Sequence, residues 1–584
     1  MHDSDERRWG GGLVDVGKAF IDLRNRLLQD DLSPAAAARA FSWPQFPHFN
    51  WARDYFDRMA AGNDRAALRV VDDAGLDQTL SFAALARRSD QVANYLAAQG
   101  VGPGDRVLIM LGNVVPLWET MLATIKLGAT MIPATTLLQR TDLEDRLTRG
   151  RVHAIVADGA HTAHFEGLAG APIRIAVGGA GPGWRAFEDS HGADSSRRQS
   201  DSTDANALML LYFTSGTTAK PKLVAHTHTS YPVGHLSTAY WIGLRRGDVH
   251  LNLSSPGWAK HAWSCFFAPW NAEATVLAYQ FQRFNAAALL DQIVRCRVTT
   301  FCAPPTVWRM LIQEDVRRWP VTLREVVGAG EPLNPEVIEQ VRSAWGLTIR
   351  DGFGQTETTA QIGNPPGMTL KPGSMGVPLP GYTVHLVSSD GAIGDEGEIC
   401  IDVASQCVGL MQGYLDDSDK TAEVMRNGLY HTGDVASRDA DGYFTYVGRL
   451  DDVFKSSDYR ISPFELESVL IEHRAVAEAA VVPSPDPLRL SVPKAFVVLA
   501  AGEVGDSATA RSILEHVRGR VAPFKRIRRI EFAELPKTIS GKIRRVELRR
   551  AEADRPFGTA RRTQEYWEED FAVAPPGTRA AKSE

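Results

Sequence analysis

The sequence predicts an α/β fold, with parallel strands covered by helices and a smaller α+β unit from about residue 450. Three observations lead to this fold class. The 584 residues suffice for about three to five structural units. From Leu80 onward, short apolar runs alternate with segments of helical spacing, which favours strands joined by crossover helices. Apolar residues make up 44% and charged residues 23%, which excludes a wholly disordered chain.

The first strand–helix–strand unit is predicted between residues 106 and 134. The apolar run Arg106–Leu111 is a candidate buried strand, and Asn113 is a candidate N-cap for the helix that follows. Apolar side chains recur at helical spacing as far as Ile125, and Gly128 is a typical stop signal. Thr130–Ala134 is then predicted as the neighbouring strand.

Further elements are predicted from similar patterns. In the first part of the chain we expect strands at 208–213, 299–303 and 325–327. Past residue 450 we expect strands at 479–482, 495–499 and 527–532, with a helix at 510–521. Residues 551–584 are rich in Arg, Glu, Pro and Ala and show little periodicity, so we expect a loosely held tail.

Composition excludes several classes of protein. The 64 basic and 70 acidic residues give a net charge of −6, which provides no general attraction to nucleic acid or anionic membranes. The chain has five cysteines and no CxxC pair, so we expect neither a disulfide framework nor a Cys-rich zinc site. No run approaches the ~20 apolar residues of a membrane span, and the polar N-terminus lacks the apolar core of a signal peptide. We therefore expect a cytoplasmic protein.

A loop rich in hydroxyl groups follows the strand predicted at 208–213. It reads Thr214-Ser-Gly-Thr-Thr-Ala-Lys-Pro-Lys222. Its backbone N–H groups and hydroxyls suit a polyphosphate, two lysines add positive charge, and Gly216 allows close approach of the backbone. It is not a Walker A loop, because GxxxxGK[ST] is absent. On composition alone, an ordinary surface turn remains an alternative.

Four further motifs carry chemistry. In Asp351-Gly-Phe-Gly-Gln-Thr-Glu357 the aromatic residue suits a flat ligand and Glu357 suits Mg²⁺. In Tyr430-His-Thr-Gly-Asp434 the aspartate can bind the two hydroxyls of a ribose, although an Asx turn is the alternative. The fourth motif runs from Gly448 to Lys455 and continues from Tyr459 to Glu465. In the fifth, Pro536-Lys-Thr-Ile-Ser-Gly-Lys542, a lysine on a Gly-Ser loop suits the charge of a transferring phosphoryl group.

These five motifs, in this order, resemble the acyl- and aryl-adenylating family, which includes acyl-CoA synthetases, firefly luciferase and the adenylation domains of peptide synthetases. The resemblance covers about residues 50–550. Within the family, Ser255–Trp263, Ala329–Pro332 and Lys371–Gly376 resemble the medium-chain acyl-CoA synthetase branch, which includes benzoate-type ligases.

The resemblance implies a large N-terminal domain of two doubly wound sheets plus a distorted β-barrel, followed by a small mobile α+β domain. The implied boundaries are an N-terminal arm at 1–50, an adenylation domain at 51–450, a mobile domain at 451–550 and a tail at 551–584. It also implies two half-reactions that use ATP, Mg²⁺ and CoA. A carboxylate first attacks the α-phosphate of ATP, and the CoA thiol then attacks the acyl-AMP.

The resemblance also implies roles for matching residues. The catalytic positions are Lys542, Thr356 and Glu357, and Glu357 is also the Mg²⁺ ligand. The ATP- and AMP-binding positions are Thr214, Ser215, Gly216, Thr217, Thr218, Lys222, Gly330, Glu331, Pro332, Asp351, Gly352, Phe353, Gly354, Gln355, Asp434, Arg449 and Arg460. The hinge is Asp451, the acyl pocket holds Trp258, His261 and Ala329, and the CoA channel holds Ser456, Ser457, Asp458 and Tyr459.

Three positions depart from the family pattern. Ala219 stands where the phosphate loop usually has Gly, and we expect it to be tolerated because the hydroxyl run and both lysines remain. Asp458 stands where the channel for the pantetheine arm of CoA usually has Gly, and it adds bulk and negative charge. The sequence therefore supports transfer of the acyl group to CoA less strongly than it supports adenylation. Leu490 also replaces a frequent Gly, in a surface-like loop to which we attach little weight.

The substrate class follows from the segment around Trp258. A tryptophan buries a large apolar face, so we expect an apolar acid of moderate size, with Trp263 and Phe266 adding to the wall of the pocket. A carboxylate nucleophile has a pKa of about 4 and needs no general base. The histidines at 226, 228 and 261 are therefore interpreted as walls of the pocket. Twelve basic residues against three acids between Arg518 and Arg550 indicate a solvated face or attraction of the CoA 3′-phosphate.

The sequence thus predicts an AMP-forming carboxylate–CoA ligase for medium-chain or aromatic acids, present as a monomer or homodimer. Its partners are a small carboxylic acid, ATP and CoA, without nucleic acid or a membrane span. Two alternatives stay open. One is an adenylating enzyme whose acceptor is an amine or a carrier protein, which Asp458 motivates. The other is a nucleotide-binding regulator that has lost catalysis.

Overall fold

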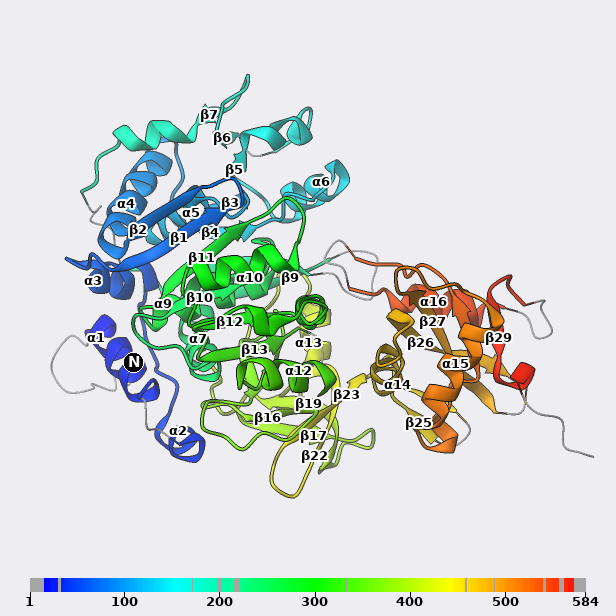
Figure 1. Ribbon diagram of the computed structural model, residues 1–584. Helices are drawn as coiled ribbons and strands as arrows, with labels where there is room; N and C mark the ends of the chain where they lie inside the picture. Colours follow the sequence, from blue (N-terminus) through cyan, green and yellow to red (C-terminus); the bar gives the residue numbers. More distant parts are fainter. Residues whose placement is uncertain are drawn as a thin grey trace, which may run out of the picture. The chain divides into compact units, whose positions relative to one another are not determined.

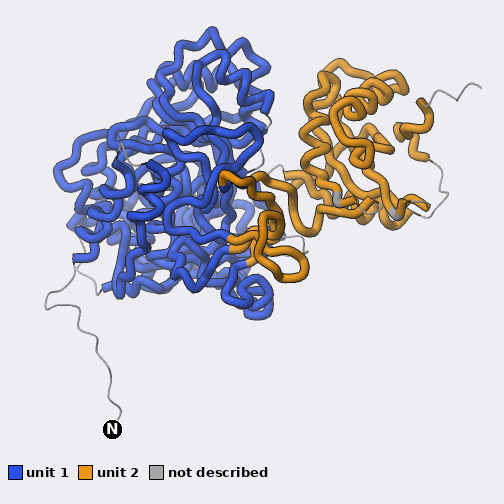
Figure 2. Tube along the Cα trace, turned by 90° about the horizontal axis from the view of Figure 1, so that it is seen from below, with its two compact units in different colours: residues 1–384, 401–430, 442–444 blue, residues 385–400, 431–441, 445–584 orange. Residues whose placement is uncertain are grey.

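The computed structural model describes residues 15–29, 33–170, 172–196, 202–214, 221–330, 333, 335–456, 459–487, 489–538, 542–555 and 561–571. The chain divides into two compact units (Figure 2). Unit 1 comprises residues 1–384, 401–430 and 442–444, and unit 2 comprises residues 385–400, 431–441 and 445–584. In the described part of the chain, no helix has both the length and the apolar character needed to cross a membrane.

One sheet of unit 1 has eight strands in the order β20-β9-β8-β4-β3-β5-β6-β7. Their bounds are β3 (Arg106–Met110), β4 (Thr130–Pro133), β5 (Ala154–Asp158), β6 (Ile173–Val177), β7 (Arg185–Ala186), β8 (Leu208–Thr214), β9 (Lys222–Thr227) and β20 (Gly413–Tyr414). The strands from β8 to β7 pair in parallel, whereas β9 pairs antiparallel with both β8 and β20. The strands predicted at 106–111, 130–134 and 208–213 are confirmed.

Helix α4 (Phe82–Ala98) leads into β3, α5 (Val115–Lys126) connects β3 with β4, and α6 (Arg140–Arg149) connects β4 with β5. The predicted N-cap of α5 is wrong, because Val114 occupies that position and makes no capping hydrogen bond. The side chain of Asn113 is engaged elsewhere, since its Oδ1 lies 3.2 Å from Nε2 of His261. A tertiary contact has therefore replaced the local one that the sequence suggested.

The second sheet of unit 1 runs in the order β16-β15-β14-β13-β12-β10-β11-β1-β2. Its strands are β1 (Ala66–Asp72), β2 (Asp77–Ser81), β10 (Val249–Asn252), β11 (Thr275–Gln280), β12 (Thr300–Ala303), β13 (Glu325–Ala329), β14 (Arg350–Gly354), β15 (Ala360–Gly363) and β16 (Ser374–Pro378). Neighbouring strands from β14 to β1 pair in parallel, whereas β15 pairs antiparallel with both β14 and β16, and β2 pairs antiparallel with β1. The strands predicted at 299–303 and 325–327 are confirmed.

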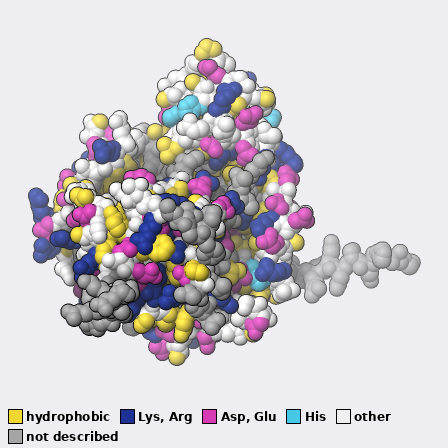
Figure 3. All heavy atoms as spheres, turned by 90° about the vertical axis from the view of Figure 1, so that its right-hand side faces the viewer, with side chains coloured by type: hydrophobic (Ala, Val, Ile, Leu, Met, Phe, Trp, Pro, Cys, Tyr) yellow, Lys and Arg dark blue, Asp and Glu magenta, His cyan; other side chains and the backbone are white. Residues whose placement is uncertain are grey.

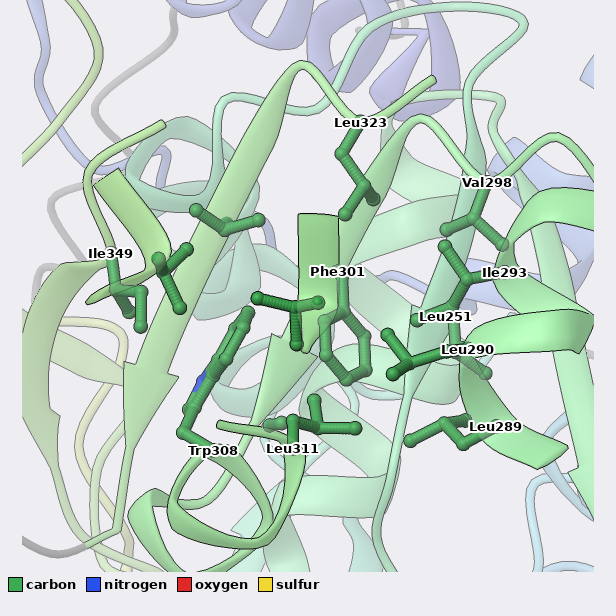
Figure 4. Packing of buried hydrophobic residues seen from close by; sticks show 14 of the residues in the cluster. Leu251, Leu289, Leu290, Ile293, Val298, Phe301, Trp308, Leu311, Leu323 and Ile349 are labelled. Carbon is green, nitrogen blue, oxygen red and sulfur yellow. The ribbon is translucent and has the colours of Figure 1, made fainter. Parts of the chain in front are cut away.

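A large apolar core lies between this sheet and the helices α10 (Ala286–Arg295), α11 (Pro305–Leu311) and α12 (Pro335–Trp345) (Figure 1). Phe301 of β12 lies at its centre, between Trp308 of α11 and Leu290 of α10 (Figure 4). Each fully buried side chain of this kind contributes about 1.5–3 kcal/mol. The core fixes the strands firmly, so the loops at their carboxyl ends have a rigid support.

The chain before β1 packs on unit 1 through α1 (Val16–Leu27), and α2 (Pro34–Ala40) and a π-helical turn at Trp51–Phe56 follow. Arg24 of α1 is nearly buried and forms a 2.8 Å ion pair with Glu273. The same guanidinium donates to the hydroxyl of Tyr55 at 3.2 Å. The segment is therefore tied to the sheet by charge as well as by apolar contact.

Unit 2 contains strands in the order β18-β17-β19-β22-β23 and a four-stranded sheet in the order β26-β27-β28-β29. Their bounds are β17 (Val384–Val387), β18 (Ile393–Gly394), β19 (Glu396–Asp402), β22 (Leu429–Arg438), β23 (Phe444–Arg449), β26 (Val476–Asp486), β27 (Leu490–Leu499), β28 (Arg529–Phe532) and β29 (Glu565–Trp567). The helices are α14 (Pro463–Ile471), α15 (Ser507–Arg518) and α16 (Arg545–Ala553). The predicted strands at 479–482, 495–499 and 527–532 and the helix at 510–521 are confirmed, with shifted ends.

The expectation of a loosely held tail from residue 551 is wrong for its described part. Helix α16 continues to Ala553, and β29 pairs antiparallel with β28. The cause is a fully buried amino group in β27, Lys494, which forms ion pairs with Glu531 at 2.8 Å, Glu552 at 3.0 Å and Glu565 at 3.1 Å. Because Glu565 belongs to β29, this charge holds the late segment in the fold.

Basic and acidic side chains are mixed over the face shown in Figure 3. Several basic residues of the stretch 518–550 are paired within unit 2. Lys525 pairs with Glu465 at 2.7 Å, and Arg545 pairs with Glu467. These residues are thus partly neutralised by neighbours, and the interpretation of a solvated face does not hold for Arg545, because its partner Glu467 is buried.

Candidate functional site

The two sheets of unit 1 meet at the segment that follows β14. Parallel pairing sets Ala329 of β13 opposite Gly352 of β14, so the carboxyl ends of the two strands lie at one edge of the sheet. Gly330 and Phe353 follow at that edge. Thr214 ends β8 and Lys222 begins β9 in the other sheet. The predicted site residues that lie outside the described residues are Ser215, Gly216, Thr217, Thr218, Glu331, Pro332, Ser457 and Asp458.

Glu357 contacts the first sheet through Tyr414. The hydroxyl of Tyr414, in β20, donates to Oε1 of Glu357 at 2.9 Å. Nζ of Lys222 lies 3.4 Å from the same hydroxyl and 4.9 Å from the centroid of the ring. A carboxylate and a lysine from distant parts of the chain are thus brought to one place. Sequence reasoning missed Tyr414, since a two-residue strand has no periodic signal.

Thr356 is positioned by a buried histidine. Nε2 of His226, in β9, donates to the carbonyl oxygen of Thr356 at 2.8 Å, and Nδ1 lies 3.2 Å from Oγ of Ser230. Burial lowers the pKa of His226 to about 4, so the ring is neutral at neutral pH. Burial likewise lowers the pKa values of His228 and His261 to about 3. Such rings are poor bases at neutral pH, and their interpretation as walls of the acyl pocket stays a prediction.

Asp351 lies half-buried at the start of the motif. The N–H of Gly352 donates to its Oδ1 at 2.9 Å, but burial dominates and raises the pKa of Asp351 to about 7. Nearby, Nζ of Lys260 donates to the carbonyl oxygen of Ala329 at 2.9 Å. This contact ties the Ser255–Trp263 segment to the edge of the second sheet, where the adenylate-binding motif is expected.

The predicted acyl-pocket residues lie at the start of α8 (Ala259–Ala262). Trp258 is half-buried at the N-cap position, and His261 is buried with its ring 5.7 Å from that of Trp118. A Cβ on Gly257 would lie 2.3 Å from the backbone nitrogen of Thr135, so only glycine fits there. The close contact between the backbones of Gly257 and Thr135 fixes the position of the chain directly before Trp258.

Asp434 of unit 2 lies buried in β22 and accepts two hydrogen bonds. Tyr446 donates to Oδ1 at 2.9 Å, and Arg449 donates to Oδ2 at 3.1 Å. The guanidinium of Arg449 also lies 3.5 Å from Asp451. The predicted ribose ligand, the predicted arginine and the predicted hinge are therefore directly connected. The backbone of Arg460 lies in β25 (Tyr459–Ile461) across from Lys455, and the predicted CoA-channel residues Tyr459 and Ser456 form the neighbouring pair.

The turn before Asp434 is held by a carboxylate that the sequence did not single out. The N–H of Gly433 donates to Oε1 of Glu398 at 2.8 Å, and Nδ1 of His431 lies 2.8 Å from Oε2. Sγ of Cys400 lies 3.3 Å from the same ring nitrogen. Glu398 thereby positions the segment that carries Asp434.

Lys542 lies at the end of a short loop, with an exposed side chain. Its backbone N–H donates to Oγ1 of Thr538 at 3.1 Å, and its carbonyl accepts from the N–H of Thr538 at 2.8 Å. Lys537 and Ile543 form an isolated β-bridge beside this pair. Lys542 is thus hydrogen-bonded to Thr538 through its main chain, and its exposed side chain suits a mobile cation.

Comparison with known protein families gives two matches. Residues 56–415 match the AMP-binding enzyme family, and residues 465–542 match the AMP-binding enzyme C-terminal domain. The chain is 42% identical over 554 residues to 4-hydroxybutyrate–CoA ligase 1 of Metallosphaera sedula, which covers 93% of this chain and 97% of that protein. It is 39% identical over 528 residues to the human mitochondrial acyl-coenzyme A synthetase ACSM3, which covers 86% and 90%.

Solved structures show the same fold. The anthranilate CoA ligase AuaEII in complex with anthranoyl-AMP matches with a TM-score of 0.80 and 28% identity, covering 87% of this chain and 98% of that one. A benzoate CoA ligase from Burkholderia xenovorans LB400 matches with a TM-score of 0.74 and 29% identity, covering 86% and 100%. The predicted fold class, a large N-terminal α/β part and a smaller C-terminal part, is confirmed.

Proposed function

The chain belongs to the AMP-binding enzyme family, as an AMP-forming carboxylate–CoA ligase of the medium-chain acyl-CoA synthetase branch, and we propose here which residues act and which acids it accepts. One observation carries the assignment of residues. Thr356 and Glu357, at the end of the second sheet, contact His226 and Tyr414 of the first sheet. The lysine of the predicted phosphate loop, Lys222, and the carboxylate of Glu357 therefore lie close together, because both lie beside the hydroxyl of Tyr414.

In the first half-reaction the carboxylate of the acid attacks the α-phosphate of ATP and releases pyrophosphate. The nucleophile is already ionised at neutral pH, so the enzyme needs to align it and to neutralise charge. We propose that the loop from Thr214 to Lys222 binds the phosphates and that Thr356 contacts the α-phosphate. Phe353 stacks near the base, and Asp434 holds the ribose.

We propose that Glu357 holds Mg²⁺. The carboxylate of Glu357 is partly buried, and Tyr414 donates to its Oε1 and not to its Oε2. Carboxylate oxygens are ligands that Mg²⁺ prefers. When bound, the ion neutralises phosphate charge. Lys542 then supplies a positive charge to the phosphoryl group in transfer, and Asp451 is the hinge between the half-reactions. In the second half-reaction the CoA thiol attacks the acyl carbon and AMP leaves.

The acid class follows from the acyl segment. Trp258 is half-buried, and His261 is buried in its neutral form, so the lining at Ala329 and the start of α8 carries no ionised histidine. The relatives named above act on 4-hydroxybutyrate, anthranilate or benzoate according to their names. We propose a medium-chain or aromatic acid. A cytoplasmic location and a monomeric or dimeric state stay predictions.

The test is an endpoint assay with ATP, Mg²⁺ and CoA against acids from acetate to dodecanoate and against benzoate and its hydroxy and amino derivatives. AMP and acyl-CoA are both read by mass spectrometry. Equal amounts of the two products are expected for the preferred acid. Acyl-AMP that accumulates with CoA present would favour another acceptor, and ATP binding without pyrophosphate release for any acid would favour an inactive regulator.

Glu357→Gln is expected to weaken the apparent affinity for Mg²⁺ by more than about tenfold, because a charged ligand is replaced by a neutral one. The amide oxygen still accepts the hydrogen bond from Tyr414, so the fold is retained. Initial rates of pyrophosphate release against Mg²⁺ concentration measure the effect. Glu423→Gln, at an exposed carboxylate of α13 (Ser418–Val424), is the control. An unchanged Mg²⁺ dependence for Glu357→Gln would refute the role as ligand.

A further inference from the structure

Three side chains whose atoms can bind a metal ion converge in unit 2, beside the turn that carries Asp434. Glu398 and Cys400 belong to β19, and His431 belongs to the neighbouring strand β22. A carboxylate oxygen of Glu398, Sγ of Cys400 and a ring nitrogen of His431 all lie within 4.8 Å of one another. All three residues are buried. We refer to these three residues as the β19–β22 cluster.

The backbone of the two strands fixes this arrangement. Residues two positions apart on a strand project to the same face of a sheet, so Glu398 and Cys400 present their side chains together. The hydroxyl of Thr432, directly after His431, donates to the carbonyl oxygen of Ile399 at 2.7 Å and joins the two strands at this point. The sheet itself therefore brings the three candidate ligand atoms together, which is the support that a metal site needs.

One ring nitrogen of His431 is shared between the other two members of the cluster. Its Nδ1 lies 2.8 Å from Oε2 of Glu398 and 3.3 Å from Sγ of Cys400. This nitrogen can donate a proton to the carboxylate or accept one from the thiol, and it cannot do both at once. A metal ion accepts a lone pair from the nitrogen, the sulfur and the oxygen together. The shared nitrogen therefore indicates a cation as a partner that suits all three atoms.

The mixture of ligand atoms selects the kind of ion. Thiolate and imidazole are ligands of Zn²⁺ and similar transition-metal ions, whereas Mg²⁺ and Ca²⁺ take oxygen ligands. Zn²⁺ binds sulfur at about 2.3 Å and nitrogen or oxygen at about 2.0–2.2 Å, so its tetrahedral ligands lie about 3.3–3.6 Å apart. Compared with the 2.8 Å and 3.3 Å of the cluster, the side chains need to move by less than about 1 Å.

We propose that the β19–β22 cluster binds one Zn²⁺ ion through Sγ of Cys400, Nδ1 of His431 and Oε2 of Glu398, with water as the fourth ligand. The thiol of Cys400 releases its proton to solvent, because the thiolate is the ligand. Cys400 is 0% exposed, whereas His431 and Glu398 are 8% and 9% exposed, so the ion enters from the side of these two residues. The Mg²⁺ position proposed at Glu357 belongs to unit 1 and is a separate site.

The bound ion stabilises the turn before Asp434. Oε1 of Glu398 accepts from the N–H of Gly433 at 2.8 Å, and Asp434 is the next residue. An ion on Oε2 restrains the same carboxylate and, through it, the backbone of the turn. Amide hydrogen exchange in β22 is therefore expected to slow when zinc binds, whether or not ATP, CoA or an acid is present.

The experiment uses the full-length protein, freed of metals with a chelator, then incubated with a small excess of Zn²⁺ and passed through a desalting column. Elemental mass spectrometry is expected to find about one zinc per chain. With Co²⁺ in place of zinc, the absorption spectrum is expected to show a band of charge transfer from thiolate to cobalt. Fewer than about 0.2 zinc ions per chain, or a cobalt spectrum without this band, would overturn the proposal.

Cys400→Ser tests whether the ion binds at this cluster, because a hydroxyl has the shape of the thiol but is a poor ligand for zinc. The variant is expected to lose the cobalt band and to bind zinc at least about tenfold more weakly. Cys407→Ser alters a half-buried cysteine outside the cluster and is expected to keep both properties. An unchanged cobalt band in Cys400→Ser would overturn the proposal.

Peptide-resolved hydrogen exchange over residues 429–438 tests the effect on the turn. Zinc is expected to slow exchange there in the unmodified protein and in Cys407→Ser, but not in Cys400→Ser. Exchange that zinc leaves unchanged in the unmodified protein would overturn the proposal. Because zinc content, the cobalt spectrum and exchange are all measured on the unmodified protein as well, the proposal can be refuted even if Cys400→Ser does not fold.

Discussion

Replacement of Lys542 by alanine is expected to lower the rate of acyl-AMP formation by at least about 10²–10³-fold, because a positive charge aimed at the transferring phosphoryl group is lost. Its amino group is exposed, and the surrounding backbone is fixed by hydrogen bonds between the main chain of residue 542 and Thr538 that alanine retains. The fold and ATP binding should therefore be unchanged. Single-turnover measurement of pyrophosphate release gives the rate.

The second half-reaction provides the internal check on Lys542→Ala. Thioester formation from supplied acyl-AMP and CoA is expected to proceed at the normal rate, since that step breaks the bond between the acyl carbon and the phosphate oxygen and transfers no phosphoryl group. Lys537→Ala is the matched control, because Lys537 lies in the same loop and forms a 2.8 Å ion pair with Glu478. Full adenylation by Lys542→Ala would refute the proposed role of Lys542 in adenylation. Slow adenylation by Lys537→Ala would mean that the effect comes from disturbing the loop and not from the charge of Lys542.

Replacement of Lys494 by methionine is expected to destabilise unit 2 by about 3–5 kcal/mol. The amino group is fully buried among Glu531, Glu552 and Glu565, and its removal takes away the cation that contacts all three carboxylates, while Arg555 and Arg562 each contact two of them. Burial raises the pKa of Glu565, but the backbone hydrogen bond from Arg562 and the charges of Lys494 and Arg555 outweigh it and hold this pKa at about 2, against an ordinary value of 4.5. The folded-state pKa is depressed, so this stabilisation is present above about pH 4.5 and is lost as the pH falls towards 2.

The loss of stability of unit 2 in Lys494→Met is measured by calorimetry combined with peptide-resolved hydrogen exchange over β27 and β28. Lys525→Met is the control, because Lys525 also pairs with a glutamate, Glu465, but at the surface, where such pairs contribute about 0–1 kcal/mol. Equal protection of β28 in the two variants would contradict the buried network as the source of stability. A loss confined to unit 1 would contradict it as well.

Much of the fold was predictable because its signals are local. The run at 208–213 is apolar without interruption, as is typical of a buried strand, and it forms β8. The late strand β29 was not predictable, since three residues carry no periodicity. Its place depends on Lys494, which lies about 70 residues earlier and whose burial no local pattern reveals.

The candidate site divides in the same way. Thr356, Glu357 and Lys542 could be predicted because they stand in motifs whose residue types and spacing are recognisable in the sequence. The residues that contact Thr356 and Glu357 could not be predicted, since Tyr414 is 57 positions from Glu357 and His226 is 130 positions from Thr356. Those contacts arise only when the two sheets pack together.

The pairing of β29 with β28 bears on self-association. An open strand edge presents N–H and C=O groups that recruit another strand, often from a second copy of the chain. Here the outermost strand has only three residues, and its Trp567 is covered by the guanidinium groups of Arg529 and Arg561, 4.2 Å and 4.3 Å from the ring centroid. A chain cut at residue 542, where the family match ends, would lose this cover and expose the backbone of β28. We therefore expect the segment after Lys542 to protect this sheet edge from self-association, so a chain shortened to residue 542 should precipitate more readily than the full chain.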